Sequence, residues 1–137
     1  MSLELNSENT LKPGLNAEVQ ITVSETETAA HLGSGSLDVY ATPALVALME
    51  NTAIRALEGY LPPGHTTVGG QIDVRHIAAT PVGMQVHAHA DLVDVRGHKL
   101  TFRIQAWDEL EQIGEADHVR FLVEEETFMA KSREKGK

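Results

Sequence analysis

The sequence predicts an α+β domain in which one long helix packs against a single antiparallel sheet that curls round it. Residues 42–59, TPALVALMENTAIRALEG, carry apolar side chains at helical spacing. The stretches on either side of this segment alternate apolar and polar residues, which is typical of strands joined by turns. One apolar helix beside one antiparallel sheet gives two layers around a shared core.

Both ends of the predicted helix are marked. The hydroxyl of Thr42 is expected to cap the first turn, and Pro43 suits the first helical position, where its missing N–H is no loss. Gly59 can adopt the left-handed conformation that ends a helix, and Pro62 and Pro63 prevent continuation. The sequence therefore predicts one long central helix with defined limits.

The strands are predicted from period-two alternation, with turn residues between them. Two adjacent glycines, Gly69 and Gly70, indicate a bulge or a close backbone approach within one strand. Residues 25–36 are acidic and then glycine-rich, so we expect a loop that can serve as a flexible lid. About five strands are expected, at residues 15–24, 66–77, 84–95, 100–107 and 113–128.

The length of 137 residues fits one domain, which we place at residues 15–130 between a flexible N-terminal segment, 1–14, and a charged C-terminal tail, 131–137. There is no cysteine, which fits a reducing, cytoplasmic setting. No apolar run is long enough to span a membrane, and the first residues lack the features of an export signal. A net charge of −9 argues against nonspecific nucleic-acid binding.

Glu50 interrupts the apolar face of the predicted helix, where its neighbours at helical spacing include Val46, Ile54 and Leu57. Burial of an unpaired carboxylate is costly, so Glu50 is expected to be paired, protonated or beside a cavity. Two structural explanations fit this pattern: an ion pair between Glu50 and an arginine, or a helix rotated so that Glu50 reaches water. The functional explanation is acid–base chemistry at this carboxylate.

Other polar residues have similar double interpretations. His76 lies in phase with an apolar strand face, either as a hydrogen-bonded core residue or as a group for proton transfer. Arg120 lies on a strand and can meet the phosphates of a ligand, or be solvated or paired. His87 and His89 share a strand face, but no third ligand with suitable spacing is evident, so we expect no metal and no other cofactor.

Two segments, VYATPALVALMENTAIRAL at 39–57 and VGGQIDVRHIAATPVG at 68–83, are similar to the hot-dog-fold thioesterases, and among them to the fluoroacetyl-CoA thioesterase type. The similarity continues through residues 92–121. This resemblance implies a hot-dog fold, a homodimer and hydrolysis of an acyl-CoA thioester.

The resemblance also implies site residues. The family's catalytic threonine falls on Thr42, its glutamate on Glu50 in Leu-Met-Glu and its histidine on His76 in His-x-Ala-Ala-Thr-Pro. Gly69 matches a glycine whose backbone N–H is expected to face the thioester carbonyl. From the residues alone, either Gly69 or Gly70 can donate a backbone N–H to this oxygen, or the two glycines simply form a bulge. Residues 31–36, HLGSGS, depart from the family, because they lack the lid phenylalanines associated with fluoroacetyl specificity.

We therefore expect an acyl-CoA thioesterase that acts on short acyl groups. Glu50 is expected to act as nucleophile or general base, His76 as proton-transfer partner, Thr42 as positioning hydroxyl, and Gly69, Gly70 and Arg120 as substrate-binding residues. A catalytically silent acyl-CoA-binding module on the same fold is the alternative. A hot-dog dehydratase or hydratase is a third, although the motifs in which those enzymes typically place their acid–base residues are not found.

Overall fold

The computed structural model describes residues 10–137, so most of the predicted flexible segment 1–14 lies outside the described part. Within that part the chain forms a short 3₁₀ turn, η1, three α-helices and five strands. In chain order these are β1 (Asn16–Thr22), η1 (Glu25–Glu27), α2 (Ala29–Leu32), α3 (Thr42–Ala56), β2 (His65–His76), β3 (Gln85–Arg96), β4 (Lys99–Trp107), β5 (Gln112–Glu124) and α4 (Glu125–Glu134).

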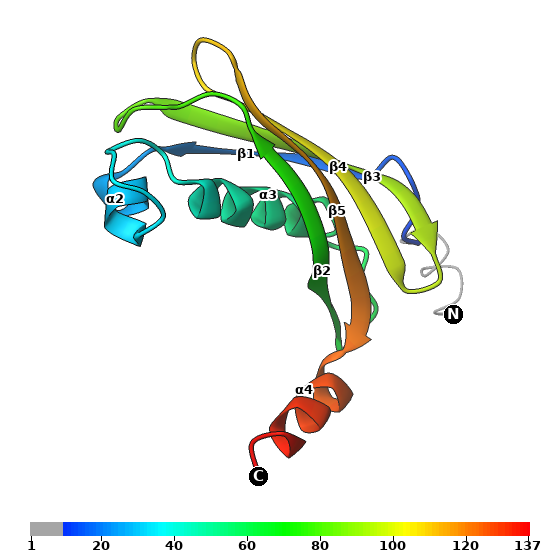
Figure 1. Ribbon diagram of the computed structural model, residues 1–137. Helices are drawn as coiled ribbons and strands as arrows, with labels where there is room; N and C mark the ends of the chain where they lie inside the picture. Colours follow the sequence, from blue (N-terminus) through cyan, green and yellow to red (C-terminus); the bar gives the residue numbers. More distant parts are fainter. Residues whose placement is uncertain (1–9) are drawn as a thin grey trace.

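The strands form one sheet in the order β1-β3-β4-β5-β2, and every neighbouring pair is antiparallel. The sheet is strongly curved, and α3 runs along its concave side (Figure 1). This arrangement confirms the predicted α+β fold, in which a curved antiparallel sheet of five strands wraps one long helix.

The core lies between α3 and the concave face of the sheet. Buried α3 side chains, including Leu45 and Met49, meet the inward-facing residues of β3, β4 and β5. A Cβ atom added at Gly114 of β5 would lie 2.9 Å from Leu45 Cδ2 and 3.2 Å from Met49 Cε, so glycine is needed for the helix to approach this strand. Close packing here fixes the position of α3 against the sheet.

Gly70 lies at a bulge in β2, as the paired glycines predicted. Gly69 pairs with Arg120 of β5, whereas the next paired residue of β2 is Gln71, which pairs with Val119. The ladder therefore skips one residue at Gly70.

Several local predictions were wrong, and α3 ends at Ala56 instead of the predicted Gly59. The N-cap of α3 is Ala41, which makes no side-chain cap, so Thr42 is the first helical residue instead of the cap. Residues 25–36 contain η1 and α2 instead of a continuous loop. The last strand ends at Glu124, and α4 follows it through much of the predicted tail. Acidic residues in the first turn of α4 and basic residues in the last turn favour this helix.

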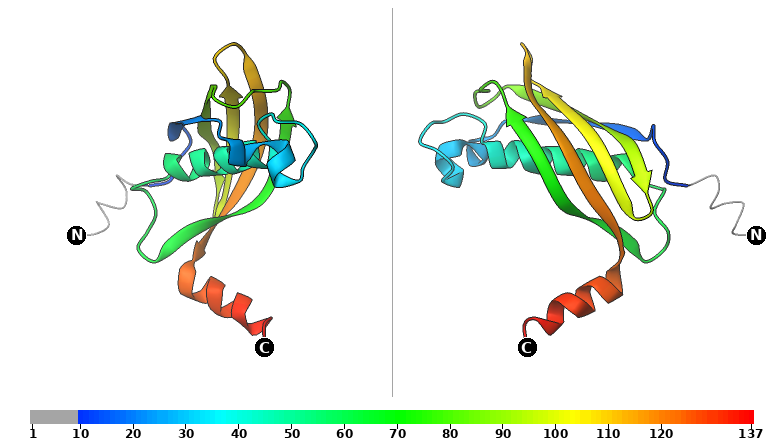
Figure 2. Two further views of the ribbon diagram at one scale, coloured as in Figure 1. Left: turned by 90° about the vertical axis from the view of Figure 1, so that its left-hand side faces the viewer. Right: turned by 45° about the vertical axis from the view of Figure 1, so that its right-hand side comes forward.

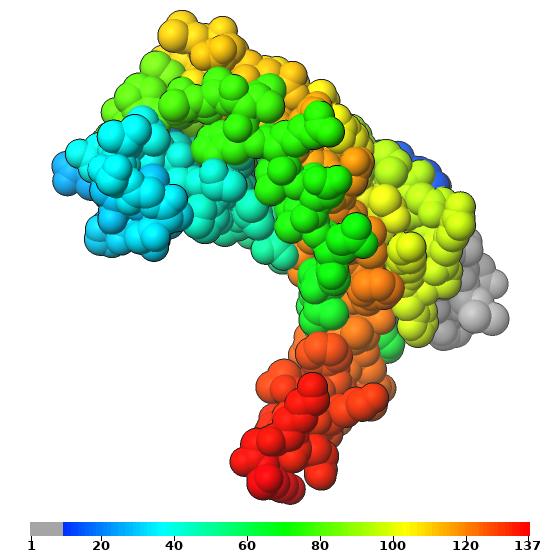
Figure 3. Space-filling view, viewed as in Figure 1, coloured from blue at the N-terminus to red at the C-terminus, as the bar shows by residue number. Residues whose placement is uncertain are grey.

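The C-terminal helix α4 projects from the end of β5, away from α3 (Figure 2). The space-filling view shows a broad hollow bounded by α4 on one side and by the residues around α2 and α3 on the other (Figure 3). β2 borders this hollow and is an edge strand of the sheet. In the described range 10–137, no helix is long and apolar enough to cross a membrane.

Candidate active site

Thr42 and His76 meet at the start of α3, where β2 ends. The Thr42 hydroxyl oxygen and His76 Nδ1 lie 2.7 Å apart and share a hydrogen bond. Because Ala41 occupies the N-cap, the Thr42 hydroxyl is not engaged in capping and is available to the imidazole. We call these two residues the threonine–histidine pair.

The threonine–histidine pair borders an open hollow of about 320 Å³. His76 Nε2 is the one buried side-chain nitrogen or oxygen of residues 10–137 that lacks a hydrogen-bond partner. Desolvation by burial lowers the pKa of His76 below its ordinary value, and the nearby Ala78 backbone partly opposes this effect. A neutral imidazole with a free nitrogen beside a hollow is suited to proton transfer. The hollow is lined by Ala29, Ser34, Val39, Tyr40, Thr42, His76, Ile77, Ala78 and Ala79.

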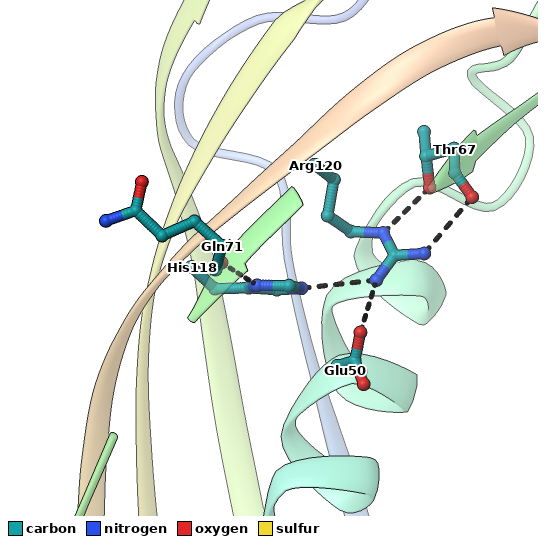
Figure 4. A network of polar contacts seen from close by, with 5 residues as sticks. All are labelled: Glu50, Thr67, Gln71, His118 and Arg120. Carbon is teal, nitrogen blue, oxygen red and sulfur yellow. Dashed lines mark hydrogen bonds and ion pairs between the residues drawn. The ribbon is translucent and has the colours of Figure 1, made fainter. Parts of the chain in front are cut away.

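Glu50 lies two turns further along α3, with its side chain 40% exposed. Its Oε2 atom accepts a hydrogen bond from Arg120 Nη1 at 3.3 Å. Both structural explanations for this carboxylate therefore hold together, because Glu50 has an arginine partner and also reaches the surface. In the close view its second carboxylate oxygen points away from the guanidinium (Figure 4).

Arg120 projects inward from β5, and its side chain is only 5% exposed. Its Nε donates to the Thr67 hydroxyl at 2.9 Å and its Nη2 to the Thr67 carbonyl at 3.1 Å. Nη1 is shared between Glu50 and His118, whose Nε2 lies 3.2 Å away. These contacts hold the guanidinium on several sides, as Figure 4 shows. We call Glu50, Thr67, Gly69, His118 and Arg120 the glutamate cluster.

The two glycines of β2 make room for side chains on opposite faces of the sheet. A Cβ atom at Gly69 would lie 2.6 Å from Glu50 Oε2 and 3.4 Å from Arg120 Nη1. A Cβ atom at Gly70 would instead lie 2.4 Å from the ring of Phe121. Gly69 thus admits the carboxylate of Glu50, and Gly70 admits an aromatic ring.

Eight residues of α3 separate Thr42 from Glu50, which corresponds to about 12 Å of helical rise. Within residues 10–137, no hydrogen bond or ion pair links the threonine–histidine pair to the glutamate cluster. The structure therefore brings the predicted site residues together as two groups in one chain, with Gly69 and Arg120 in the group of Glu50.

Sequence reasoning missed His118 and Thr67. His118 is 1% exposed and occupies the inward phase of β5 with Ala116 and Arg120. The inward phase of β5 could not be read from the sequence, because the apolar Val119 and Phe121 lie in the opposite phase, so His118 gave no usable signal. Thr67 offered no such signal, because a threonine on a strand is ordinary.

The other histidines of the sheet do not form a metal centre. His87 stacks on Trp107, with ring centroids 5.1 Å apart. His89 Nε2 lies 3.0 Å from Asp91 and its Nδ1 lies 3.7 Å from Glu18. Throughout residues 10–137, no group of three or more potential ligands is arranged to hold a metal ion.

Comparisons with known proteins agree with this fold. A mutant of the thioesterase FlK, solved in complex with acetyl-CoA, is 35% identical, with a TM-score of 0.86 over 91% of this chain and 98% of that chain. A thioesterase-superfamily member from Thermus thermophilus is 25% identical, with a TM-score of 0.83 over 90% of this chain and 91% of that one. The protein is therefore a thioesterase of the hot-dog fold.

The family can be stated more closely. The family model described as fluoroacetyl-CoA-specific thioesterase matches residues 23–126. The fluoroacetyl-CoA thioesterase of Streptantibioticus cattleyicolor is 42% identical over 98 residues, which are 72% of this chain and 70% of the relative. The chain belongs to the FlK family of thioesterases.

Proposed function

We propose that this thioesterase hydrolyses a short-chain acyl-CoA to the free acid and coenzyme A. The observation that carries this proposal is the threonine–histidine pair, with a free imidazole nitrogen beside an open hollow. Relatives of the chain support the substrate class, because they include a fluoroacetyl-CoA thioesterase and a structure of FlK with acetyl-CoA.

Glu50 supplies the chemistry at the thioester carbonyl by one of two routes. As a nucleophile, its carboxylate attacks the carbonyl carbon, the C–S bond breaks, and water then hydrolyses the mixed anhydride. As a general base, it removes a proton from the water that attacks the carbonyl. In both routes we assign to His76 the uptake of a proton from solvent on its free nitrogen and the transfer of that proton, from the imidazolium, to the departing sulfur, which returns the imidazole to its neutral form. We assign to Thr42 the orientation of the imidazole.

The amides of Gly69 and Gly70 are proposed to face the thioester oxygen, because the bulge interrupts the strand ladder close to Glu50. A backbone N–H aimed at the oxygen that becomes negative stabilises the transition state. For Arg120 the geometry favours a different role from the predicted contact with substrate phosphates. Its guanidinium is buried and already bonded to Thr67 and Glu50, so we propose that it orients Glu50.

We further propose a homodimer in which two copies of β2 pair with each other. β2 is an edge strand of 12 residues beside a broad hollow, and such an edge usually has to be covered (Figure 3). Antiparallel pairing reverses the second strand, which brings its His76 end toward the half of the first strand that contains Gly69. The two groups of site residues then meet across the interface, and each active site takes Glu50 from one copy and Thr42 and His76 from the other.

The acyl specificity is proposed to differ from that of the fluoroacetyl enzyme. Residues 31–36 contain no phenylalanine, and Ser34 is one of the small residues that line the hollow beside His76. An aromatic lid over a fluorinated carbon is therefore not expected.

The cytoplasmic setting that the lack of cysteine suggested stays a prediction.

Free thiol release from a panel of acyl-CoAs, including acetyl-CoA and fluoroacetyl-CoA, tests this proposal. Wild type is expected to turn over at least one short acyl-CoA, and Glu50→Ala to reduce that turnover about 10²-fold or more. Glu58→Ala is the matched control, because Glu58 is an exposed glutamate just beyond the end of α3. Binding of coenzyme A without turnover of any thioester would instead identify an acyl-CoA-binding module.

A further inference from the structure

His118 is a buried histidine that the proposed reaction does not use. It lies on β5, two residues before Arg120, and is 1% exposed. The ring of Phe102 packs near it, with centroids 6.1 Å apart. An apolar side chain would fill this place without the cost of burying two ring nitrogens. The presence of a histidine therefore calls for a specific polar role.

The hydrogen bonds of His118 define its tautomer. Nδ1 lies 2.8 Å from the Gln71 carbonyl oxygen, which can only accept, so Nδ1 carries the proton. Nε2 faces Arg120 Nη1 at 3.2 Å, and a guanidinium can only donate, so Nε2 offers its lone pair. His118 is thus a neutral imidazole that accepts from Arg120. Burial is the main factor that lowers the pKa of His118, and Arg120 adds to it, whereas the Gln71 contact and Glu50 oppose it.

This acceptor determines where the guanidinium points. Nη1 donates to both Glu50 Oε2 and His118 Nε2, while the other side of the guanidinium is held by the hydroxyl and carbonyl of Thr67. The side chain of Glu50 is 40% exposed, and Glu50 is the only one of these partners that reaches the surface. The buried contacts therefore anchor Arg120, and Arg120 in turn anchors the exposed carboxylate.

We propose that His118 is a positioning residue, which acts on Glu50 through Arg120 and does not touch the substrate. This inference rests on the proposed function of Glu50. Misplacement of a reacting group by about 1 Å is sufficient to reduce a rate on the order of 10²-fold. Loss of the acceptor at His118 should therefore lower kcat, and should leave KM nearly unchanged.

Two substitutions separate the two ring nitrogens. His118→Gln places an amide oxygen near the position of Nε2 and keeps an acceptor for Arg120, but loses the donor to the Gln71 carbonyl. His118→Asn places an amide near Nδ1 and keeps that donor, but loses the acceptor for Arg120. With the preferred acyl-CoA, kcat of His118→Asn should be at least tenfold lower than kcat of His118→Gln, and the two KM values should be similar. A rate loss of this order is expected when the Glu50 carboxylate is misplaced. Equal kcat values, or a faster Asn variant, would overturn the proposal.

The route through Arg120 has its own test. In an Arg120→Ala background, His118→Asn and His118→Gln should have the same kcat, because the group on which they act is gone. A difference that persists in this background would mean that His118 acts by another path, and would also overturn the proposal.

A spectroscopic measurement on the wild-type protein does not depend on activity or on the folding of variants. The ¹⁵N resonances of His118 should be those of a neutral ring protonated at Nδ1. Protonation at Nε2 near neutral pH would contradict the proposal. If the wild type turns over no acyl-CoA, the proposed function fails, while this spectrum still decides whether His118 is an acceptor for Arg120.

Discussion

The threonine–histidine pair and the glutamate cluster each include one residue of α3, Thr42 and Glu50, but they differ in how their polar groups are satisfied. His76 has one hydrogen-bonded nitrogen and one free nitrogen, beside an open hollow. Arg120 and His118 are buried and hydrogen-bonded to their neighbours, so that in this cluster the carboxylate of Glu50 is the group that reaches the surface.

We interpret this contrast as a difference in role between the two groups of residues. Groups with free hydrogen-bonding capacity are available to a substrate, whereas satisfied groups hold others in place. The rigid environment of Glu50 suits a carboxylate that must meet a carbonyl in one orientation. His76 borders the hollow and has an unpaired, buried Nε2, which suits a group that exchanges protons with a ligand.

A large effect is expected at the threonine–histidine pair. His76→Gln removes the titrating imidazole, and we expect kcat for acyl-CoA hydrolysis to fall about 10²-fold. His87→Gln is the matched control, since His87 stacks on Trp107 away from the site, and its kcat should be unchanged. Initial rates of thiol release measure both. Equal effects of the two substitutions on kcat would contradict the proton-transfer role proposed for His76.

A smaller effect is expected from the two adjacent glycines. Gly69→Ala places a Cβ atom against Glu50 Oε2 and should displace the carboxylate from Arg120, so kcat should fall roughly tenfold. Gly70→Ala meets the ring of Phe121 instead and keeps the backbone amide, so it should mainly lower the urea midpoint of unfolding and reduce kcat less than Gly69→Ala does. If Gly70→Ala impaired catalysis as much as Gly69→Ala, the different effects assigned to the two faces of the sheet would be contradicted.

The pH dependence of stability should reveal the buried histidines. His76 and His118 have pKa values below the ordinary 6.5, so in the window just below 6.5 the unfolded chain binds more protons than the folded chain. The free energy of unfolding should therefore fall as the pH decreases from about 7 to about 5. His118→Gln should show a smaller fall in urea titrations at these pH values, and an unchanged fall would argue against a buried neutral His118.

The smallest effect is expected at an arginine on the outer face of the sheet. Arg103 is 39% exposed and pairs with Glu115 at 2.8 Å and Asp117 at 3.4 Å. Exposed pairs of this kind contribute about 0–1 kcal/mol, so Arg103→Gln should change the free energy of unfolding by no more than this and leave kcat unchanged. Arg120→Gln, at a buried pair, should lower both quantities measurably. Similar results for both arginines would contradict the assigned role of Arg120.

Much of the fold could be predicted from the sequence, because its signals are local. The apolar periodicity of residues 42–59 predicts the helix, although α3 ends at Ala56, with Leu57 as its C-cap, three residues before the left-handed Gly59, whose φ is 85°. The helix begins with Ala41 as its cap, one residue earlier than predicted, since helix ends are the least certain part of a pattern. The helix α4 was missed because alternation carried the strand prediction past Glu124.

Part of the site could not be predicted because β5 reverses the usual pattern. His118 and Arg120 face inward, while Val119 is half-buried and Phe121 is 39% exposed. A pattern that places apolar residues inside would have turned this strand over. Glu50 was detectable, because a charge on an otherwise apolar helix face is conspicuous. Its link to Arg120 spans 70 residues and depends on the sheet topology.

We propose that the two groups of polar residues form one active site across a homodimer. Glu50→Gln and His76→Gln should each be almost inactive alone. When the two variants are mixed, unfolded and refolded together, mixed dimers contain one site with both native residues, and activity should return to about a quarter of the wild-type value. No recovery, with mixed dimers present by native mass spectrometry, would contradict the claim.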